Sequence, residues 1–151
     1  MKNEFIKFGA MRQNQLDLLN ELTLDQINKI PEGFSNNIIW NIGHNLVVQQ
    51  LLTYRLSNLQ IRVSEELVEM FKKDSKPERP ITNEEFDMVK ALLIDSVTWV
   101  EEDYNTGLFK DYQTYTTSLN VTLNSTAEAI SFNTIHEAMH FGCALAIKYF
   151  V

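Results

Sequence analysis

The chain has 151 residues, of which 44% are hydrophobic and 22% are charged, and its formal net charge at pH 7 is -7. This length and composition are typical of one soluble globular domain, and we expect a single domain that covers residues 1–151. The acidic balance disfavours a nucleic-acid partner, because a negatively charged surface repels phosphate backbones. No stretch approaches about 18 consecutive apolar residues, so no membrane association is expected.

The chain contains one cysteine, Cys143, so an internal disulfide is excluded and a reducing compartment is favoured. The N-terminal stretch MKNEFIKFGAMRQNQ lacks the continuous apolar segment of a signal peptide. We therefore expect a cytoplasmic protein. Cys143 itself is expected to be a small buried core residue, rather than a ligand or a reactive thiol.

The first half of the chain predicts two long helices. Apolar residues recur at helical spacing over residues 3–29, with a break or kink expected at residues 23–25. A proline and a glycine then interrupt the pattern. The second helix begins after Ser-Asn-Asn at residues 35–37, which are good N-cap residues, and it ends near Leu59.

The second half predicts a short helix from Ser64 and two further long helices. A capping box at Thr82 starts a helix that runs to about Tyr104, and another at Ser125 starts the last helix. The stretch 112–124 is rich in threonine and tyrosine, which predicts an extended connection or a short hairpin. Four long helices joined by connections of uneven length predict an all-α fold, a four-helix bundle.

All three histidines of the chain fall on apolar helical stripes. His136 and His140, in the motif HEAMH, lie one turn apart, so their imidazoles can converge. His44 lies in the same way on the second helix. We expect the three rings to face the bundle axis and to form a divalent-metal site, because neutral imidazole binds several first-row metal ions. The pattern does not distinguish zinc, nickel, iron or manganese. The open alternative is that each histidine is a satisfied core residue.

HEAMH also matches the H-E-x-x-H signature of zinc proteases, in which the glutamate acts as the general base. Such a protease needs a third ligand after the motif. None of the residues that follow His140 is Asp, Glu or His. Glu137 lies about 100° around the helix from His136, so a surface carboxylate or a neighbour of the site is as consistent with its position as a base. The sequence therefore argues against a protease.

Three other residues are candidates for the surroundings of the site. Asn41 and Asn133 each precede a predicted ligand by one turn, so they are expected to orient a histidine or bind substrate. The alternative is that each is a polar residue of the helix interior bonded to water or to another helix. Trp40 is expected to be a core anchor beside the site. The residue pattern identifies no catalytic residue.

Two segments resemble the DinB-like superfamily of metalloenzymes. WNIGHNLVVQQLLTY, residues 40–54, is similar to the family's second helix, in which a tryptophan precedes the first ligand histidine by four residues. IHEAMHFGCALAIKYF, residues 135–150, is similar to its last helix, in which an H-x-x-x-H pair supplies the other two ligands. The spacing of the helices and the total length also match, so the resemblance covers nearly the whole domain.

The resemblance implies a four-helix bundle in an up-down-down-up arrangement, with a long crossover between the second and third helices. It implies a homodimer and a divalent metal ion held by His44, His136 and His140. Some family members transfer low-molecular-weight thiols such as bacillithiol onto electrophiles. The expected function is therefore a metal-dependent thiol transferase, or else a hydrolase, with a small-molecule substrate. The open alternative is a non-catalytic metal-binding or structural dimeric bundle.

Overall fold

The computed structural model describes residues 1–151, and its fold is all-α apart from one small hairpin, which confirms the predicted fold class. The elements in chain order are α1 (Lys2–Asn20), α2 (Leu24–Asn28), α3 (Ile38–Thr53), the 3-10 helix η1 (Arg55–Ser57), α4 (Glu65–Phe71), α5 (Asn83–Asn105), β1 (Tyr115–Thr116), β2 (Thr122–Leu123) and α6 (Thr126–Lys148).

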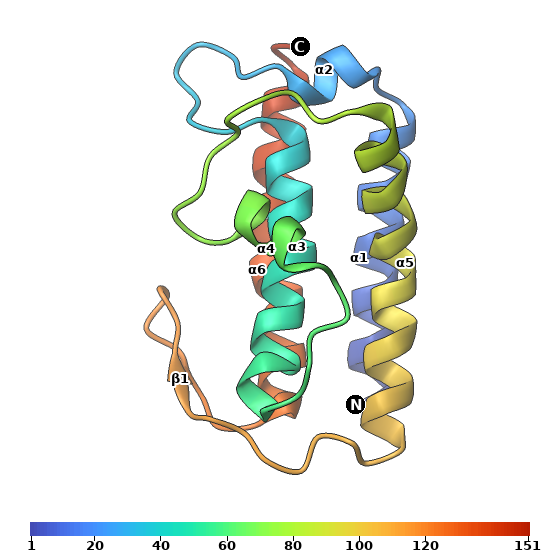
Figure 1. The fold of residues 1–151 in the computed structure, drawn as a ribbon, viewed down its shortest axis with the longest axis vertical. Helices are drawn as coiled ribbons and strands as arrows, with labels where there is room; N and C mark the ends of the chain where they lie inside the picture. Colours follow the sequence, from blue (N-terminus) through green and yellow to red (C-terminus); the bar gives the residue numbers. More distant parts are fainter.

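The long helices α1, α3, α5 and α6 lie side by side and make up most of the molecule (Figure 1). α3 packs along α6, and α1 packs against both α5 and α6. In the view of Figure 1, α1 and α6 run upward, whereas α3 and α5 run downward. The connection from α3 to α5 is long and contains α4. Helices far apart in the sequence, α3 and α6, are therefore neighbours, and this pair positions the site.

Polar residues at the helix starts satisfy backbone N–H groups that have no partner inside the helix. At the start of α3, the side chain of Asn37 accepts a hydrogen bond from the backbone N–H of Trp40. At α5, Thr82 and Glu85 form the predicted capping box, in which each side chain accepts the backbone N–H of the other residue. These caps fix where the second and third long helices begin.

The capping box predicted at Ser125 is only half formed. The Ser125 hydroxyl accepts the backbone N–H of Glu128, as predicted. The Glu128 carboxylate, however, accepts the backbone N–H of Asn124 rather than that of Ser125. The carboxylate still satisfies one N–H group at this end of α6, where negative charge is favoured by the helix dipole.

The first predicted helix breaks where the sequence indicated a break. α1 ends at Asn20, and Thr23 starts α2 through a capping box with Gln26. The second predicted helix ends earlier than expected. α3 stops at Thr53 and is followed by η1, after which Asn58 takes a left-handed backbone conformation with φ of 57°. A residue in that region cannot continue a right-handed helix.

The threonine- and tyrosine-rich stretch forms the predicted short hairpin. β1 and β2 pair antiparallel, with Tyr115 opposite Leu123. Leu123 is buried in a small apolar cluster with Leu52 of α3 and Phe132 of α6. The hairpin is therefore fixed to the same two helices that carry the histidines.

The main apolar core contains 25 buried residues and is shared by all the α-helices. α3 has buried residues on every side, so it has no exposed polar face from which its orientation could be read. None of the helices combines the length and the apolar character needed to cross a membrane.

Candidate metal centre

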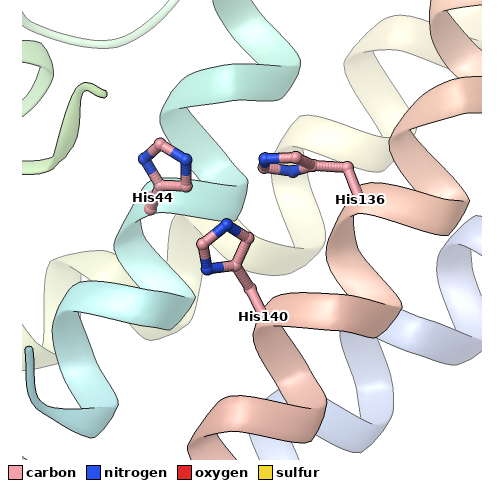
Figure 2. Close-up of side chains that lie close together, drawn as sticks. All are labelled: His44, His136 and His140. Carbon is pink, nitrogen blue, oxygen red and sulfur yellow. The ribbon is translucent and has the colours of Figure 1, made fainter. Parts of the chain in front are cut away.

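The three histidine side chains meet between α3 and α6 (Figure 2). His44 comes from α3, and His136 and His140 come from successive turns of α6. One nitrogen atom of each ring lies within 4.8 Å of the others. The ring centroids are 5.2 Å apart for His44 and His136, 4.6 Å for His44 and His140, and 4.7 Å for His136 and His140. The three predicted ligands are thus brought together around one point.

Two of the three rings are held by hydrogen bonds at their Nδ1 atoms. The Nδ1 of His44 lies 2.6 Å from the backbone carbonyl oxygen of Phe71, to which it donates. The Nδ1 of His140 lies 2.9 Å from the side-chain oxygen of Asn41, whose own amide N–H donates to the carbonyl of Asn37. Because both Nδ1 atoms donate, the Nε2 atoms keep their lone pairs for a ligand. Metal-binding histidines are commonly oriented by such partners.

Aromatic packing and burial complete the cluster. Trp40 stacks on the ring of His44, with centroids 4.7 Å apart and an angle of 11° between the planes. The Trp40 indole N–H donates to the hydroxyl of Ser75, which fixes the indole in turn. The Nδ1 atom of His136 is buried and has no hydrogen-bond partner. A buried nitrogen without a partner is costly. His136 is the one ring of the three that no other residue orients through Nδ1.

The cluster favours neutral imidazoles. Burial lowers the pKa of His136 to about 3, with further lowering from His140 and His44. Burial also lowers the pKa of His140 to about 4, with a contribution from His44. Burial lowers the pKa of His44 as well, against the opposing effect of its bond to Phe71. All three rings are therefore unprotonated at neutral pH, which is the form that binds metal ions. Three neutral nitrogen donors fit a divalent first-row cation.

A cleft of about 590 Å³ opens beside the cluster, and all three histidines line it. Its walls come from α3, α6, the β1–β2 hairpin and residues 73–75. The histidines therefore face this cleft between two helices, and the prediction that they face the axis of the four helices is wrong. A second hollow, of about 620 Å³, also borders Trp40 and is lined by none of the histidines.

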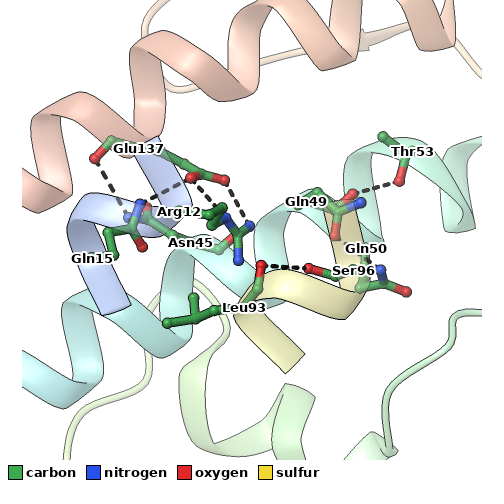
Figure 3. Close-up of polar contacts among 9 residues, drawn as sticks. All are labelled: Arg12, Gln15, Asn45, Gln49, Gln50, Thr53, Leu93, Ser96 and Glu137. Carbon is green, nitrogen blue, oxygen red and sulfur yellow. Dashed lines mark hydrogen bonds and ion pairs between the residues drawn. The ribbon is translucent and has the colours of Figure 1, made fainter. Parts of the chain in front are cut away.

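Glu137 occupies the position inside the helices that the histidines were expected to take (Figure 3). Its carboxylate accepts hydrogen bonds from Arg12 Nε at 2.8 Å and Arg12 Nη2 at 2.7 Å, and from the amide of Gln15 at 3.0 Å. Arg12 and Glu137 are both 0% exposed. Burial raises the pKa of the Glu137 carboxyl, and the Arg12 guanidinium counteracts that rise. The glutamate of HEAMH thus ties α6 to α1 and does not reach the cleft.

Of the other residues singled out from the sequence, two contact the histidine cluster and two do not. Trp40 touches the cluster and lines the cleft, and Asn41 binds His140. Asn133 is fully buried outside the cleft, and neither of its amide atoms has a partner. Cys143 is exposed, so the prediction of a buried core cysteine is wrong. Its helix turns that position away from the neighbouring helices.

The polar group inside the helices was not predicted from the sequence. Arg12 and Gln15 lie at positions of the first apolar stripe, between Phe8 and Leu19, and their helical spacing was the signal that could have revealed them. Asn45, beside His44, belongs to the same group, because Arg12 donates to its backbone carbonyl. A buried cation at an apolar position requires a buried anion, and α6 supplies it.

The comparison with protein families agrees with this geometry. The family model of the DinB superfamily matches residues 7–144. The match covers most of the chain, so the protein belongs to the DinB superfamily. Among curated proteins, none matches the chain.

Proposed function

We propose that this member of the DinB superfamily binds one divalent metal ion through His44, His136 and His140 and acts on a small molecule held in the adjoining cleft. The observation that carries the proposal is the meeting of three neutral imidazoles, with nitrogen atoms within 4.8 Å of one another, on the wall of a cleft. No protein carboxylate or thiol joins the group. Three protein donors leave coordination positions free for a substrate.

A divalent ion in such a site is a Lewis acid that favours the deprotonated form of a bound thiol or water molecule. The surrounding residues have separate tasks. Asn41 and the carbonyl of Phe71 fix the orientation of His140 and His44. Trp40 covers one face of His44 and excludes water from it. The apolar walls of the cleft strengthen electrostatic interactions by lowering the local dielectric.

The leading reaction is transfer of a low-molecular-weight thiol to an electrophile, and hydrolysis is the second candidate. In the transfer, the thiol loses its proton to solvent, its sulfur forms a bond to the electrophilic carbon, and the leaving group departs with the bonding electrons. The support is the free coordination space together with the resemblance to thiol-transferring family members. Glu137 takes no part in either reaction, because Arg12 holds it inside the helices.

A site that only stabilises the fold is the alternative. Structural metal sites are closed by four protein ligands. Here three donors converge and the fourth side borders the cleft, which favours an open, substrate-binding site. Cys143, the only thiol that could have closed the site, lies on the exposed face of α6.

The metal is tested by elemental analysis of the purified protein and by titration of the metal-free protein with Co²⁺. We expect one equivalent of Co²⁺ per chain and a d–d absorption spectrum of low coordination number. His44→Ala and His140→Ala should each abolish the spectrum, whereas Ser131→Ala, on the exposed side of the same helix, should leave it unchanged. Equal Co²⁺ binding by wild type and both histidine variants would rule the site out.

The reaction is tested by combining thiol donors with model electrophiles, using metal-loaded and metal-free protein in parallel. Thiol transfer predicts product formation that needs both the metal and the donor. Hydrolysis predicts product formation that needs the metal alone. If no metal-dependent rate is found with any pair while Co²⁺ still binds, the non-catalytic alternative replaces the enzyme.

We further propose the DinB-like up-down-down-up bundle as the architecture of this single domain and a homodimer as its assembly. The helix directions in Figure 1 and the long connection between α3 and α5 support the bundle. An exposed stripe of apolar and small residues on α6 and its C-cap supports the dimer: Ile135, Ala138, Gly142, Leu145 and Tyr149. Light scattering of wild type and Ile135→Glu tests the dimer, since a charge on the stripe should produce the monomer.

A further inference from the structure

The cleft beside the histidines has a wall that is far more apolar than metal chemistry requires. Val48, Leu51 and Leu52 of α3 follow His44 along the same face of the helix, at four, seven and eight residues after it. Side chains at these spacings share one side of an α-helix. Phe132 of α6, in the same apolar cluster as Leu52, also belongs to this wall. A substrate that contacted only the metal would leave this apolar surface exposed to water, which is unfavourable.

This apolar wall has a definite length. It begins at His44 and ends at Arg55, which also lines the cleft. The nine steps from His44 to the end of α3 at Thr53 correspond to about 13 Å along the helix at about 1.5 Å per residue, and Arg55 lies in η1 just beyond that end. The cleft volume of about 590 Å³ falls within the range of about 300–1,000 Å³ that is usual for small-molecule sites. The space therefore suits an elongated small molecule.

The β1–β2 hairpin covers the outer side of the wall. Tyr115 of β1 and residues Thr117 and Leu119 of the turn line the cleft opposite α3. Leu119 is 43% exposed, although it is a large apolar side chain at the tip of a tight turn. An apolar molecule lying along α3 would cover part of Leu119 and remove it from water.

The charges around the cleft favour a ligand with a negative group. Arg55 and Lys73 line it, against a single acidic residue, Asp74. Lys73 has no ion-pair partner, and the pair between Arg55 and Glu65 is exposed on both sides. The chain as a whole carries a formal charge of -7, so this excess of cations is local. Lys73 lies two residues before Ser75, which bonds the Trp40 indole beside His44, so Lys73 would attract an anionic donor atom toward the histidine end of the cleft, whereas Arg55 lies at the far end.

We propose that the cleft selects an elongated organic molecule with an anionic, metal-coordinating head at the histidines and an apolar body along α3, beneath the hairpin. The proposal rests on the proposed function for the head and on the apolar wall for the body. Leu51 is the specificity-determining residue, because it is only partly buried and lies between His44 and Arg55, nearer the Arg55 end.

The test uses a series of probes that differ only in apolar length: ethanethiol, butanethiol and hexanethiol. Their affinities for Co²⁺-loaded protein are measured by titration of the thiolate-to-cobalt absorption band. We expect the affinity to rise about fourfold for each added methylene that is buried. Leu51→Ser should reduce this increment, whereas Met88→Ser, an equally apolar but exposed change on α5, should preserve it. Circular dichroism of both variants verifies that they fold.

Two outcomes overturn the proposal: equal affinities for the three thiols, or the same increment in wild type and Leu51→Ser. A wild-type protein that binds no Co²⁺ contradicts the proposed function instead, and the apolar wall is then tested by a separate experiment. In that arm, the thiols displace the dye anilinonaphthalene sulfonate from metal-free protein. Stronger displacement by the longer thiols, lost in Leu51→Ser, supports the apolar body site, and displacement independent of length contradicts it.

Discussion

Removing the charge of Arg12 should destabilise the protein far more than any surface substitution. In Arg12→Met, the Glu137 carboxylate stays fully buried and keeps only the hydrogen bond from Gln15. Breaking a buried ion pair from one side costs about 3–5 kcal/mol. The whole free energy of unfolding of a domain is about 5–15 kcal/mol, so this loss is a large share of it. Glu137→Leu should cost a similar amount, because Arg12 then loses its counter-ion.

The double variant Arg12→Met/Glu137→Leu should cost less than the sum of the single variants. No charge is then buried, and the remaining loss is the Gln15 amide, which has no acceptor and costs about 1–3 kcal/mol. Urea unfolding of metal-free protein measures each value. A loss of about 4 kcal/mol shifts the midpoint by about 2 M urea at an ordinary slope. Lys7→Met is the matched control, because its ion pair with Glu4 on the same helix is partly exposed and contributes at most about 1 kcal/mol.

Two results would refute this reasoning. Single variants that cost less than about 1 kcal/mol would show that the pair is hydrated rather than buried. Additive losses in the double variant would show that the two residues do not interact. Because Glu137 does not line the cleft, Glu137→Gln should still bind Co²⁺ in the absence of urea. Loss of Co²⁺ binding in a folded Glu137→Gln variant would show that this residue contributes to the metal site.

Three further predictions concern the same helices. Gly43→Ala places a Cβ 2.6 Å from the ring of Phe71, and the clash of about 1–3 kcal/mol exceeds the gain of about 1 kcal/mol in helix propensity. The midpoint temperature of thermal unfolding and the affinity for Co²⁺ should both fall, and an unchanged midpoint temperature would contradict this packing. Thr82→Ala removes the capping box and should cost about 1 kcal/mol in urea unfolding. The metal-free protein should lose stability as the pH falls below about 6.5, because unfolded histidines then bind protons, whereas folded His136 and His140 bind them only at about pH 3 and 4. Stability should be independent of these groups above pH 7, and an identical acid slope in His136→Asn would contradict their role.

The sequence alone determined most of the local structure. Helix starts at Asn37 and Thr82 follow from side chains that accept the first free N–H groups, which is a matter of neighbouring residues. The spacing of His136 and His140 also fixes that their rings lie on one side of a helix, whatever surrounds it. The break near residue 23 and the hairpin between α5 and α6 are local as well.

Tertiary packing decided which side of each helix faces the interior. Helical periodicity gives the angle between two residues, but it does not say which direction is inward when both sides are partly apolar. α6 turns Glu137 to the interior because Arg12, distant in the sequence, supplies the charge that makes its burial tolerable. The same rotation carries His136 and His140 to the boundary with α3, where His44 meets them. The cleft depends on the packing of α3, α6 and the hairpin together, and no single segment encodes it.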